Sequence, residues 1–447
     1  MVKRHSGYFY IISIICIIAE LFAYAISDIR ILIICTSIHV GLFYVYLVRN
    51  KAKIISNIVY LIPALGVIYC FFFPFLQLEG IINSNLRMIT SEAVHNGTCY
   101  CCIFISLYVV VIVTKPVLHD SYDMTWLTNL RMNNKKIFVD LVFLAITVFY
   151  YYSISHIGGV SFLLRNTLSR RKLLDMLYDI PFYSYIQYSF ISYTIFSVIT
   201  FFNTKTSVRN IIIKLISIGN LIVFWGLNIL AGNRREFTYV ALGCFLYLLS
   251  RNKGKVKKII IFPMVLLVIF GIYIGLERSY ENTFSLSQED RIITAFGEFV
   301  YPIQTLYFYI ANHVRPYQFG STYLLVLFNL IPRNIWPNKP LSLGNQFKVD
   351  YHTTMGYAFS PMTELYINFS VFGFAIGAVI LAILFYSLSK NKAKYPLLYL
   401  SMYIETLNFF RGEVSSVIME VFLLWISLKL MIRFCSFEER KEKCRTR

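Results

Sequence analysis

The sequence predicts an all-α, polytopic integral membrane protein with about twelve transmembrane helices in a single domain, 1–447. Apolar residues form 57% of the chain and charged residues only 15%, whereas soluble domains carry about 25% charged residues. The mean hydropathy is +0.62, and apolar runs near the roughly 20 residues that one crossing needs recur along the whole length. Backbone polar groups in lipid must bond internally, and no alternating pattern indicates a barrel, so these runs are expected to be helices.

The expected spans follow one another in chain order. They are 8–26, 29–48, 57–77, 99–114, 137–155, 182–202, 211–231, 236–250, 259–276, 362–388, 396–410 and 414–433. The fourth, eighth and eleventh are short for a full crossing. Glu20 and His39 lie inside the first two spans and are expected to make internal polar contacts.

Lys and Arg in the short connections set the orientation, because cytoplasmic loops carry an excess of both. Lys3 and Arg4 precede the first span, and every second connection after it is basic. The basic groups are Arg49, Lys51, Lys53, Arg131, Lys135, Lys136, Lys205, Arg209, Arg251, Lys253, Lys255, Lys257, Lys258, Lys390, Lys392, Lys394 and the 440–447 tail. They fall on one side, which places both termini in the cytoplasm and explains most of the net charge of +19. Because these groups are separate and flank membrane spans, we expect no nucleic-acid partner.

The external side carries three longer connections. They are about 78–98, 156–181 and 277–361. The last is the largest non-membrane segment, and loops above about 15 residues are uncommon unless they are functional or disordered. Helical spacing of apolar residues from Ile292 to Ile310 predicts an amphipathic helix, lying on the bilayer or packed on the bundle. Residues 319–331 are apolar but too short to span, which favours a re-entrant or interfacial piece.

External arginines run against the usual charge bias, so each of them needs a reason. The tight turns 232–236 and 411–413 hold Arg234, Arg235 and Arg411 at headgroup depth. A guanidinium presents a planar fork that binds phosphate bidentately, so we expect these arginines to contact an anionic ligand such as a lipid pyrophosphate. The simpler alternative is that external arginines pair with nearby acids and lipid headgroups.

Acids at a similar depth extend the candidate site. Glu413 and Glu420 are seven residues apart and are expected to share a helix face. Acids in membrane segments are costly and usually face the bundle interior, as we also expect for Glu405. Pairing of Arg411 with one of these acids is an equal alternative to a role in catalysis.

Two residues are candidate general bases. Glu364 enters a helix after the potential cap Ser360, where it acts as a base or orienting group, or only complements the helix dipole. His352 is the second candidate, because histidine titrates near neutrality. No Cys/His spacing resembles a zinc site, and no phosphate loop or dinucleotide fingerprint occurs, so we expect no metal and no cofactor.

The runs FGSTYL (319–324), IPRNIWPNKP (331–340) and ELYINF (364–369), with the turns 232–236 and 411–413, carry a resemblance. Together with the topology they resemble bacterial oligosaccharide repeat-unit polymerases, the O-antigen polymerases of the Wzy type. The resemblance covers roughly 210–430 and reaches the N-terminal half only in topology. That family has an Arg followed by ten residues and a Gly in two external loops. Arg333 and Gly344 fit this spacing, whereas Arg165, Arg170 and Arg171 in the 156–181 loop lack the Gly.

The resemblance implies a metal-independent glycosyltransferase of the bacterial inner membrane. It would polymerise undecaprenyl-pyrophosphate-linked repeat units into O-antigen, the lipopolysaccharide polymer, or a related surface polysaccharide at the periplasmic face. The acceptor hydroxyl would attack the donor's anomeric carbon and undecaprenyl pyrophosphate would leave, and a polysaccharide chain-length regulator is an expected partner. The implied catalytic residues are Arg234, Arg235, Arg411, Glu364 and His352, and the implied substrate-binding residues are Arg333, Gly344, Arg291, Arg170, Arg171 and Glu413.

Two alternatives stay open. A multi-pass transporter or flippase for a lipid-linked or anionic substrate would also suit about twelve helices with both ends inside. Two related halves and interrupted binding helices, which are frequent in carriers, are not evident in the sequence. An O-antigen ligase is the nearest enzymatic alternative, because it would share the topology and the pyrophosphate chemistry.

Overall fold

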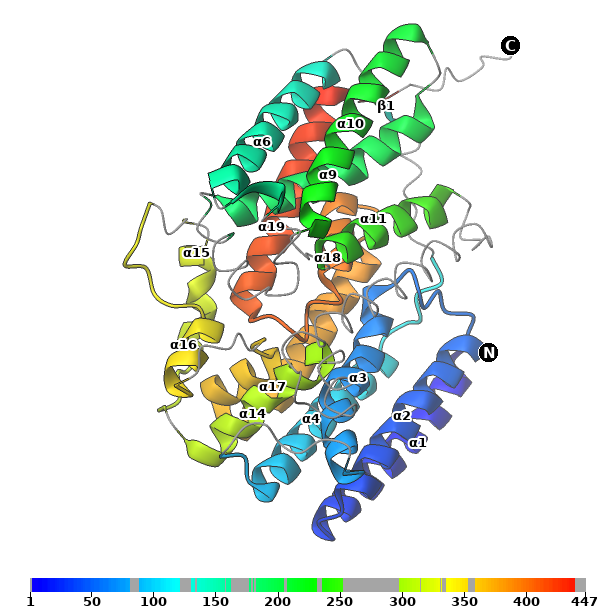
Figure 1. Ribbon diagram of the computed structural model, residues 1–447. Helices are drawn as coiled ribbons and strands as arrows, with labels where there is room; N and C mark the ends of the chain where they lie inside the picture. Colours follow the sequence, from blue (N-terminus) through cyan, green and yellow to red (C-terminus); the bar gives the residue numbers. More distant parts are fainter. Residues whose placement is uncertain are drawn as a thin grey trace, which may run out of the picture. The chain divides into compact units, whose positions relative to one another are not determined.

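The computed structural model is helical throughout the part of the chain that it describes, apart from one short strand pair (Figure 1). It describes residues 2–80, 88–120, 130–132, 135–156, 158–161, 177, 180, 182–204, 207–230, 235–251, 297–313, 315–329, 331, 335–352 and 358–438. Within these residues, 9 helices are long and apolar enough to cross a membrane. They are α1 (Val2–Ala25), α2 (Ile29–Arg49), α3 (Ile58–Leu78), α4 (Ser91–Val113), α6 (Lys136–His156), α9 (Tyr183–Asn203), α10 (Val208–Leu230), α17 (Pro361–Lys390) and α19 (Val414–Cys435). The predicted helical membrane architecture is thereby confirmed.

Three expected spans lack such a helix in the described residues. The eighth is α11 (Arg235–Arg251), which has 17 residues. The eleventh contains α18 (Pro396–Glu405), whose 10 residues are about half of what a crossing needs. The ninth, 259–276, lies outside the described residues. The total of twelve spans therefore stays a prediction.

The segment 277–361, predicted to be a large external loop, contains short helices within its described residues. They are α14 (Gly297–Asn312), η1 (Ser321–Leu324), α15 (Leu325–Asn329) and α16 (Leu343–Asp350). The predicted helix near 292–310 is confirmed from Gly297 onward. Its residues 302–310 are buried, and it packs on α3, α4 and α17, so the structure favours the packed alternative over a helix lying on the bilayer.

The described residues group into two compact units. The first draws on Met1–Ser121, Leu286–Lys394 and Glu405–Met419, and the second on Tyr122–Ser285, Tyr395–Ile404 and Glu420–Arg447. The prediction of one domain over 1–447 is not tested by this grouping.

In the first unit, α17 lies along α4, and α1 and α2 run side by side next to α4 (Figure 1). Its core is aromatic: Phe73, Tyr108, Tyr307 and Phe374 are all fully buried. A Cβ atom at Gly97 of α4 would lie only 2.6 Å from the Tyr307 ring, so this glycine sets how closely α14 approaches α4.

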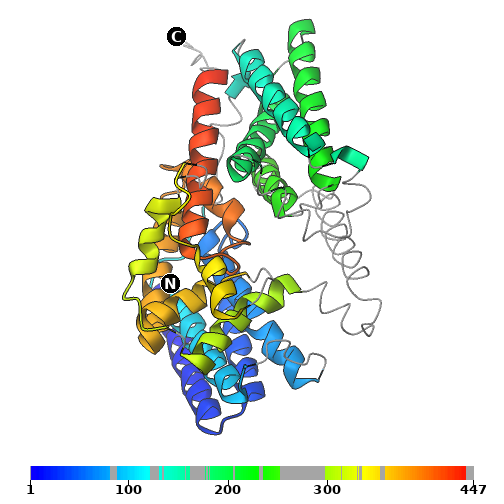
Figure 2. The ribbon, with the colours of Figure 1, turned by 60° about the vertical axis from the view of Figure 1, so that its left-hand side comes forward.

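In the second unit, α6, α9 and α10 pack together and α11 packs on α9 (Figure 2). Stacked rings form the centre of this unit, where Phe190 and Phe224 lie 3.5 Å apart and Phe143 and Tyr193 lie 4.1 Å apart, centroid to centroid. The strands β1 (Leu130–Met132) and β2 (Ser436–Glu438) pair antiparallel over three residues.

Candidate functional site

The helix α17 is broken near its start. Ser360 caps it, because its Oγ accepts a hydrogen bond of 3.1 Å from Met362 N, and proline follows directly. Phe369 and Ser370 then leave the helical conformation, and Ser370 has φ 54° and ψ −146°, a region that costs a non-glycine residue on the order of 1–3 kcal/mol. The break divides α17 into a short first part and a longer second part that continues to Lys390.

The break leaves backbone groups of α17 without partners inside the helix. These groups form hydrogen bonds with a segment about 50 residues earlier in the chain. Gln318 N donates to the Ile367 carbonyl at 2.9 Å, and Phe319 N donates to the Asn368 carbonyl at 3.2 Å. Gly320 N donates to Asn368 Oδ1 at 2.7 Å, and its φ of 87° suits glycine. A piece of the large loop therefore holds the broken helix in place.

Two glycines allow the second part of α17 to lie close to the first. A Cβ atom at Gly373 would collide with the Leu365 carbonyl, and one at Gly377 would lie 2.6 Å from the Leu365 side chain. A larger residue at either position would push the two parts of the helix away from each other.

The Glu364 carboxylate lies at the centre of this arrangement and is fully buried. Its Oε1 accepts a hydrogen bond of 2.8 Å from Thr322 Oγ1, and its Oε2 accepts one of 2.7 Å from Val414 N. Asn368 Nδ2 donates to Thr322 Oγ1 and to the Glu364 carbonyl, both at 2.7 Å. One carboxylate thus ties η1, α17 and the start of α19 together.

Glu413 is a second buried carboxylate at the start of α19. Its Oε2 accepts from Leu343 N at the start of α16, next to Gly344, and its Oε1 accepts from Ser415 Oγ at 3.0 Å and Ser416 Oγ at 2.8 Å. Negative charge is favoured at helix N-termini, which explains this placement. Glu413 precedes Val414, the first residue of α19, and bonds to groups at the helix start. It therefore does not lie on a helix face shared with Glu420, as the sequence predicted.

Three of the predicted site residues, Gly344, Glu364 and Glu413, are therefore brought to one place in the first unit. Arg411 precedes Glu413 by two residues in the turn between α18 and α19, where its N donates to the Asn408 carbonyl at 2.9 Å. The Arg411 side chain is half-buried. These residues lie at helix starts and in turns. The polar groups there are held in place without replacing side chains of the apolar core.

His352 lies apart from this hydrogen-bonded cluster. It is exposed in the turn after α16 with φ 52°, and no hydrogen bond to its imidazole occurs within the described residues. Two residues earlier, Asp350 accepts two hydrogen bonds from Arg315, at 2.7 and 2.6 Å, and one from Tyr309 at 2.7 Å. Burial raises the pKa of Asp350, but these hydrogen bonds outweigh it and hold the pKa below its usual range.

Arg235, in the second unit, pairs with acids. Its guanidinium lies 3.4 Å from Glu236 and 3.5 Å from Glu420, and 5.8 Å from the centre of the Tyr239 ring. The same holds for Arg315 and Asp350 in the first unit. The simpler alternative, pairing with nearby acids, therefore applies to both arginines, although the Arg235 side chain stays 35% exposed.

Five predicted site residues lie outside the described residues. They are Arg234, Arg333, Arg291, Arg170 and Arg171. Their roles stay predictions. Among the residues that are described, no group of three or more His, Cys, Asp or Glu side chains is arranged to hold a metal ion.

Glu20 and His39 make the expected internal contacts. Ser106 Oγ donates to Glu20 Oε1 at 2.7 Å and lies 3.2 Å from His39 Nδ1, and all three side chains are buried among α1, α2 and α4. These bonds join α1, α2 and α4 at Ser106. Polar groups of this kind are costly in a membrane interior unless they bond to each other.

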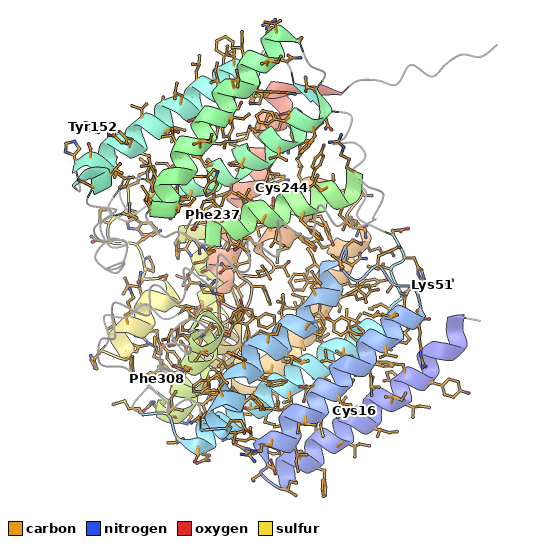
Figure 3. All side chains as sticks on the ribbon, turned by 45° about the vertical axis from the view of Figure 1, so that its right-hand side comes forward. Cys16, Lys51, Tyr152, Phe237, Cys244 and Phe308 are labelled. Carbon is orange, nitrogen blue, oxygen red and sulfur yellow. The ribbon has the colours of Figure 1, made fainter. Side chains whose placement is uncertain are left out.

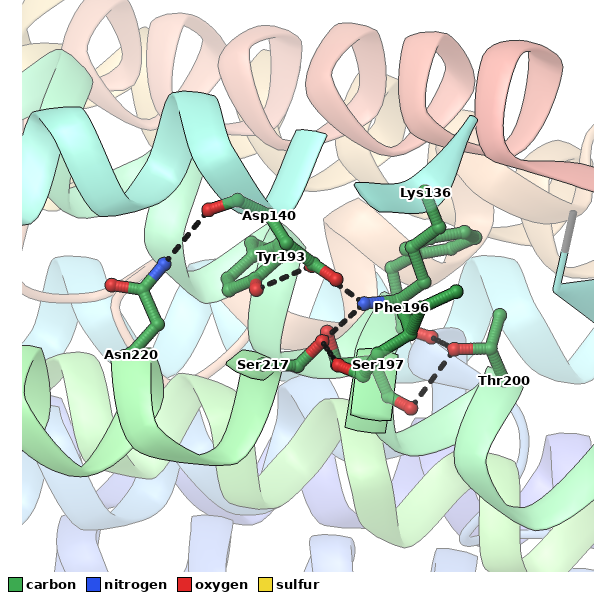
Figure 4. Close-up of polar contacts among 9 residues, drawn as sticks. Lys136, Asp140, Tyr193, Phe196, Ser197, Thr200, Ser217 and Asn220 are labelled. Carbon is green, nitrogen blue, oxygen red and sulfur yellow. Dashed lines mark hydrogen bonds and ion pairs between the residues drawn. The ribbon is translucent and has the colours of Figure 1, made fainter. Parts of the chain in front are cut away.

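The second unit contains a buried ion pair that was not predicted from the sequence. Lys136, counted there among the cytoplasmic charges, is fully buried and donates to Asp140 Oδ1 at 2.7 Å and to Ser217 Oγ at 2.5 Å (Figure 4). Tyr193 OH donates to the same Asp140 oxygen at 2.7 Å. The four-residue spacing of Lys136 and Asp140 on an apolar helix is the signal that could have revealed the pair.

Comparison with known proteins adds no family. No protein-family model matches this sequence, and neither the curated proteins nor the solved structures give a match. The resemblance to oligosaccharide polymerases therefore rests on the sequence motifs, and the function that follows is a proposal.

Proposed function

We propose that this protein is a membrane glycosyltransferase that polymerises undecaprenyl-pyrophosphate-linked repeat units into O-antigen or a related surface polysaccharide. The reaction would take place at the periplasmic face of the bacterial inner membrane. The observation that carries the proposal is the buried Glu364 carboxylate, held at the break of α17 by the large loop and the start of α19. Intramembrane acids are costly, so an acid held in place by two other segments of the chain points to a functional role.

Glu364 fits the part of a general base in this scheme. Its two oxygens use one hydrogen bond each, and a carboxylate offers about four acceptor positions, so it can also accept the proton of an acceptor hydroxyl. Glu364 is fully buried, so access of the acceptor hydroxyl requires the contacts around it to open. Arg411 would face the leaving pyrophosphate, where a positive charge stabilises the negative charge that develops.

The test is Glu364→Gln, which keeps the size and one acceptor oxygen, enough for the bond from Val414 N, but turns the other position into a donor facing Thr322 Oγ1 and removes the base. Glu79→Gln is the matched control, because Glu79 is an exposed acid of the same unit that pairs with Arg30 at 3.8 Å. Both genes would be expressed in cells lacking the chromosomal copy, and the surface polysaccharide would be separated on a gel. We expect single repeat units on the core with Glu364→Gln and a normal ladder with Glu79→Gln. A normal ladder from Glu364→Gln, at equal protein level, would refute the assignment.

A transporter is the second candidate, and the broken α17 favours it. Many carriers bind their substrate at membrane helices that are interrupted, and this helix is interrupted after its first eight residues. Deletion of the gene separates the candidates. If the deleted strain keeps single repeat units on the core, the protein is a polymerase. If lipid-linked polymer accumulates and none is attached to the core, it is a ligase. An unchanged ladder would favour the transporter.

A further inference from the structure

A groove of about 280 Å³ lies between α1 and α2, at the end where α1 begins and α2 finishes. Phe9 and Ile12 line it from α1, and Leu42 and Val45 line it from α2. Arg49, the last residue of α2, closes its end. Figure 3 labels Lys51 at this end of the helix pair and Cys16 farther along it.

The groove runs from apolar into polar surroundings. Phe9 and Ile12 belong to the first turns of the span Tyr8–Ala25, and Leu42 and Val45 belong to the last turns of α2. If these spans cross the bilayer, residues in these turns lie within its hydrocarbon and Arg49 lies at its edge. The natural occupant of an apolar groove at this depth is a lipid chain, whose headgroup would lie at Arg49.

The charge around the groove is strongly positive. Arg49 lines the groove and is exposed, Lys51 and Lys53 follow it in the chain and are also exposed, and residues 29–78 contain no Asp or Glu. Neither Arg49 nor Lys51 has an ion-pair partner in the part of the chain that the structure describes. A guanidinium binds phosphate through two parallel hydrogen bonds, so this end selects a negatively charged headgroup.

We propose that this groove binds one acidic glycerophospholipid, with an acyl chain between α1 and α2 and its phosphate on Arg49. The apolar walls favour a lipid over free phosphate, and the surrounding lysines disfavour a headgroup that carries its own positive charge. By the predicted topology, the lipid belongs to the cytoplasmic leaflet. The proposal does not depend on the proposed function, because no residue of the groove belongs to the candidate site.

Native mass spectrometry of the purified full-length protein tests the selectivity first. The protein in detergent would be titrated with dioleoyl phosphatidylglycerol and, separately, with dioleoyl phosphatidylcholine. We expect one phosphatidylglycerol to bind more tightly than phosphatidylcholine, and this measurement needs no variant. Equal binding of the two lipids would overturn the proposal.

Paired variants then locate the site. Arg49→Gln is expected to weaken phosphatidylglycerol binding about tenfold or more, because it removes charge-assisted hydrogen bonds to the phosphate as well as one positive charge. Lys51→Gln is its control, because Lys51 is also exposed but does not line the groove. An equal loss in both variants would mean general attraction to a basic surface and would overturn the proposal.

The groove itself is tested by filling it. Val45→Trp places an indole in the groove without changing the charge, so the phosphatidylglycerol adduct should be lost. Ile38→Trp is the control, because Ile38 lies on the same helix, is 53% exposed and does not line the groove. Unchanged lipid binding by a folded Val45→Trp variant would contradict the proposed position of the acyl chain.

Discussion

Removing the Asp140 side chain would leave the Lys136 ammonium buried in the second unit without its counter-ion. Both side chains are fully buried, and among the described residues Lys136 keeps the hydroxyl of Ser217 as its hydrogen-bond acceptor once Asp140 is gone (Figure 4). Tyr193 loses an acceptor at the same time. The substitution Asp140→Leu therefore has two costs, a buried charge without its counter-ion and the loss of one hydrogen bond from Tyr193.

The expected size follows from the burial of the pair. Removing one partner of a buried ion pair costs about 3–5 kcal/mol, whereas replacing both partners by apolar groups of similar volume is often neutral or stabilising. Asp140→Leu and Lys136→Met should thus each destabilise the protein by about 3 kcal/mol or more. The double variant should lie within about 1 kcal/mol of wild type, because neither charge then needs a partner. The two effects should be far from additive.

The assay is reversible unfolding of the purified protein in mixed micelles, followed by helix content as the fraction of denaturing detergent increases. Wild type, both single variants and the double variant form a double-mutant cycle. Thr147→Val is a suitable reference, because it removes a buried neutral hydroxyl that lies 2.6 Å from Asn220 Oδ1 and 2.8 Å from the Phe143 carbonyl, and side-chain hydrogen bonds between membrane helices average about 0.6 kcal/mol. Single variants that lose no more than this reference, or a double variant that loses the sum of both, would refute the reasoning.

Three further outcomes follow from contacts elsewhere in the chain. Arg235→Ala should abolish long polysaccharide while the protein stays inserted, whereas Arg251→Ala should not, and equal chain lengths on a gel would remove Arg235 from the site. The pKa of Asp350 lies below its usual range, so its pairing stabilises the protein above about pH 4 and is lost as the pH falls further. The stability difference between wild type and Asp350→Asn should shrink on acidification, as thermal unfolding at several pH values will show. Burial lowers the pKa of Lys392 to about 8. The buried charge therefore destabilises the folded protein by its full amount below pH 8, and this destabilisation disappears as the pH rises towards about 10.4, the pKa of an unperturbed lysine. Wild type should gain stability relative to Lys392→Met over that range, and a constant difference would contradict the shift.

The membrane helices could be predicted because they depend on local composition. A run such as 29–48 contains enough apolar residues to cross a bilayer whatever its neighbours are, and α2 covers Ile29–Arg49. The apolar spacing near 292–310 predicted α14 for the same reason. The break in α17 could not be predicted, because Phe369 and Ser370 are neither proline nor glycine. It depends on hydrogen bonds to Gln318 and Phe319, about 50 residues earlier.

The candidate site was predictable only in part. Glu364 and Glu413 stood out because acids are rare and costly near membrane segments. Their shared position at the start of α19 depends on tertiary contacts with Thr322 and Leu343, for which the sequence has no local signal. Lys136 was assigned to the cytoplasmic charges because the distribution of Lys and Arg reports topology and does not report burial.

The acids around Arg235 affect how a pyrophosphate could bind at the turn 232–236. Glu236 and Glu420 both lie within 3.5 Å of the guanidinium, so these three side chains carry a net charge of −1 when all are ionised. An anionic ligand would be repelled unless one carboxylate moved away, or unless Arg234 supplied a second positive charge. If Arg234 supplies that charge, Arg234→Ala should impair polymerisation at least as strongly as Arg235→Ala. If Arg234→Ala leaves chain length normal while Glu420→Gln lengthens or shortens it, the turn acts through its ion pairs and not through a bound anion.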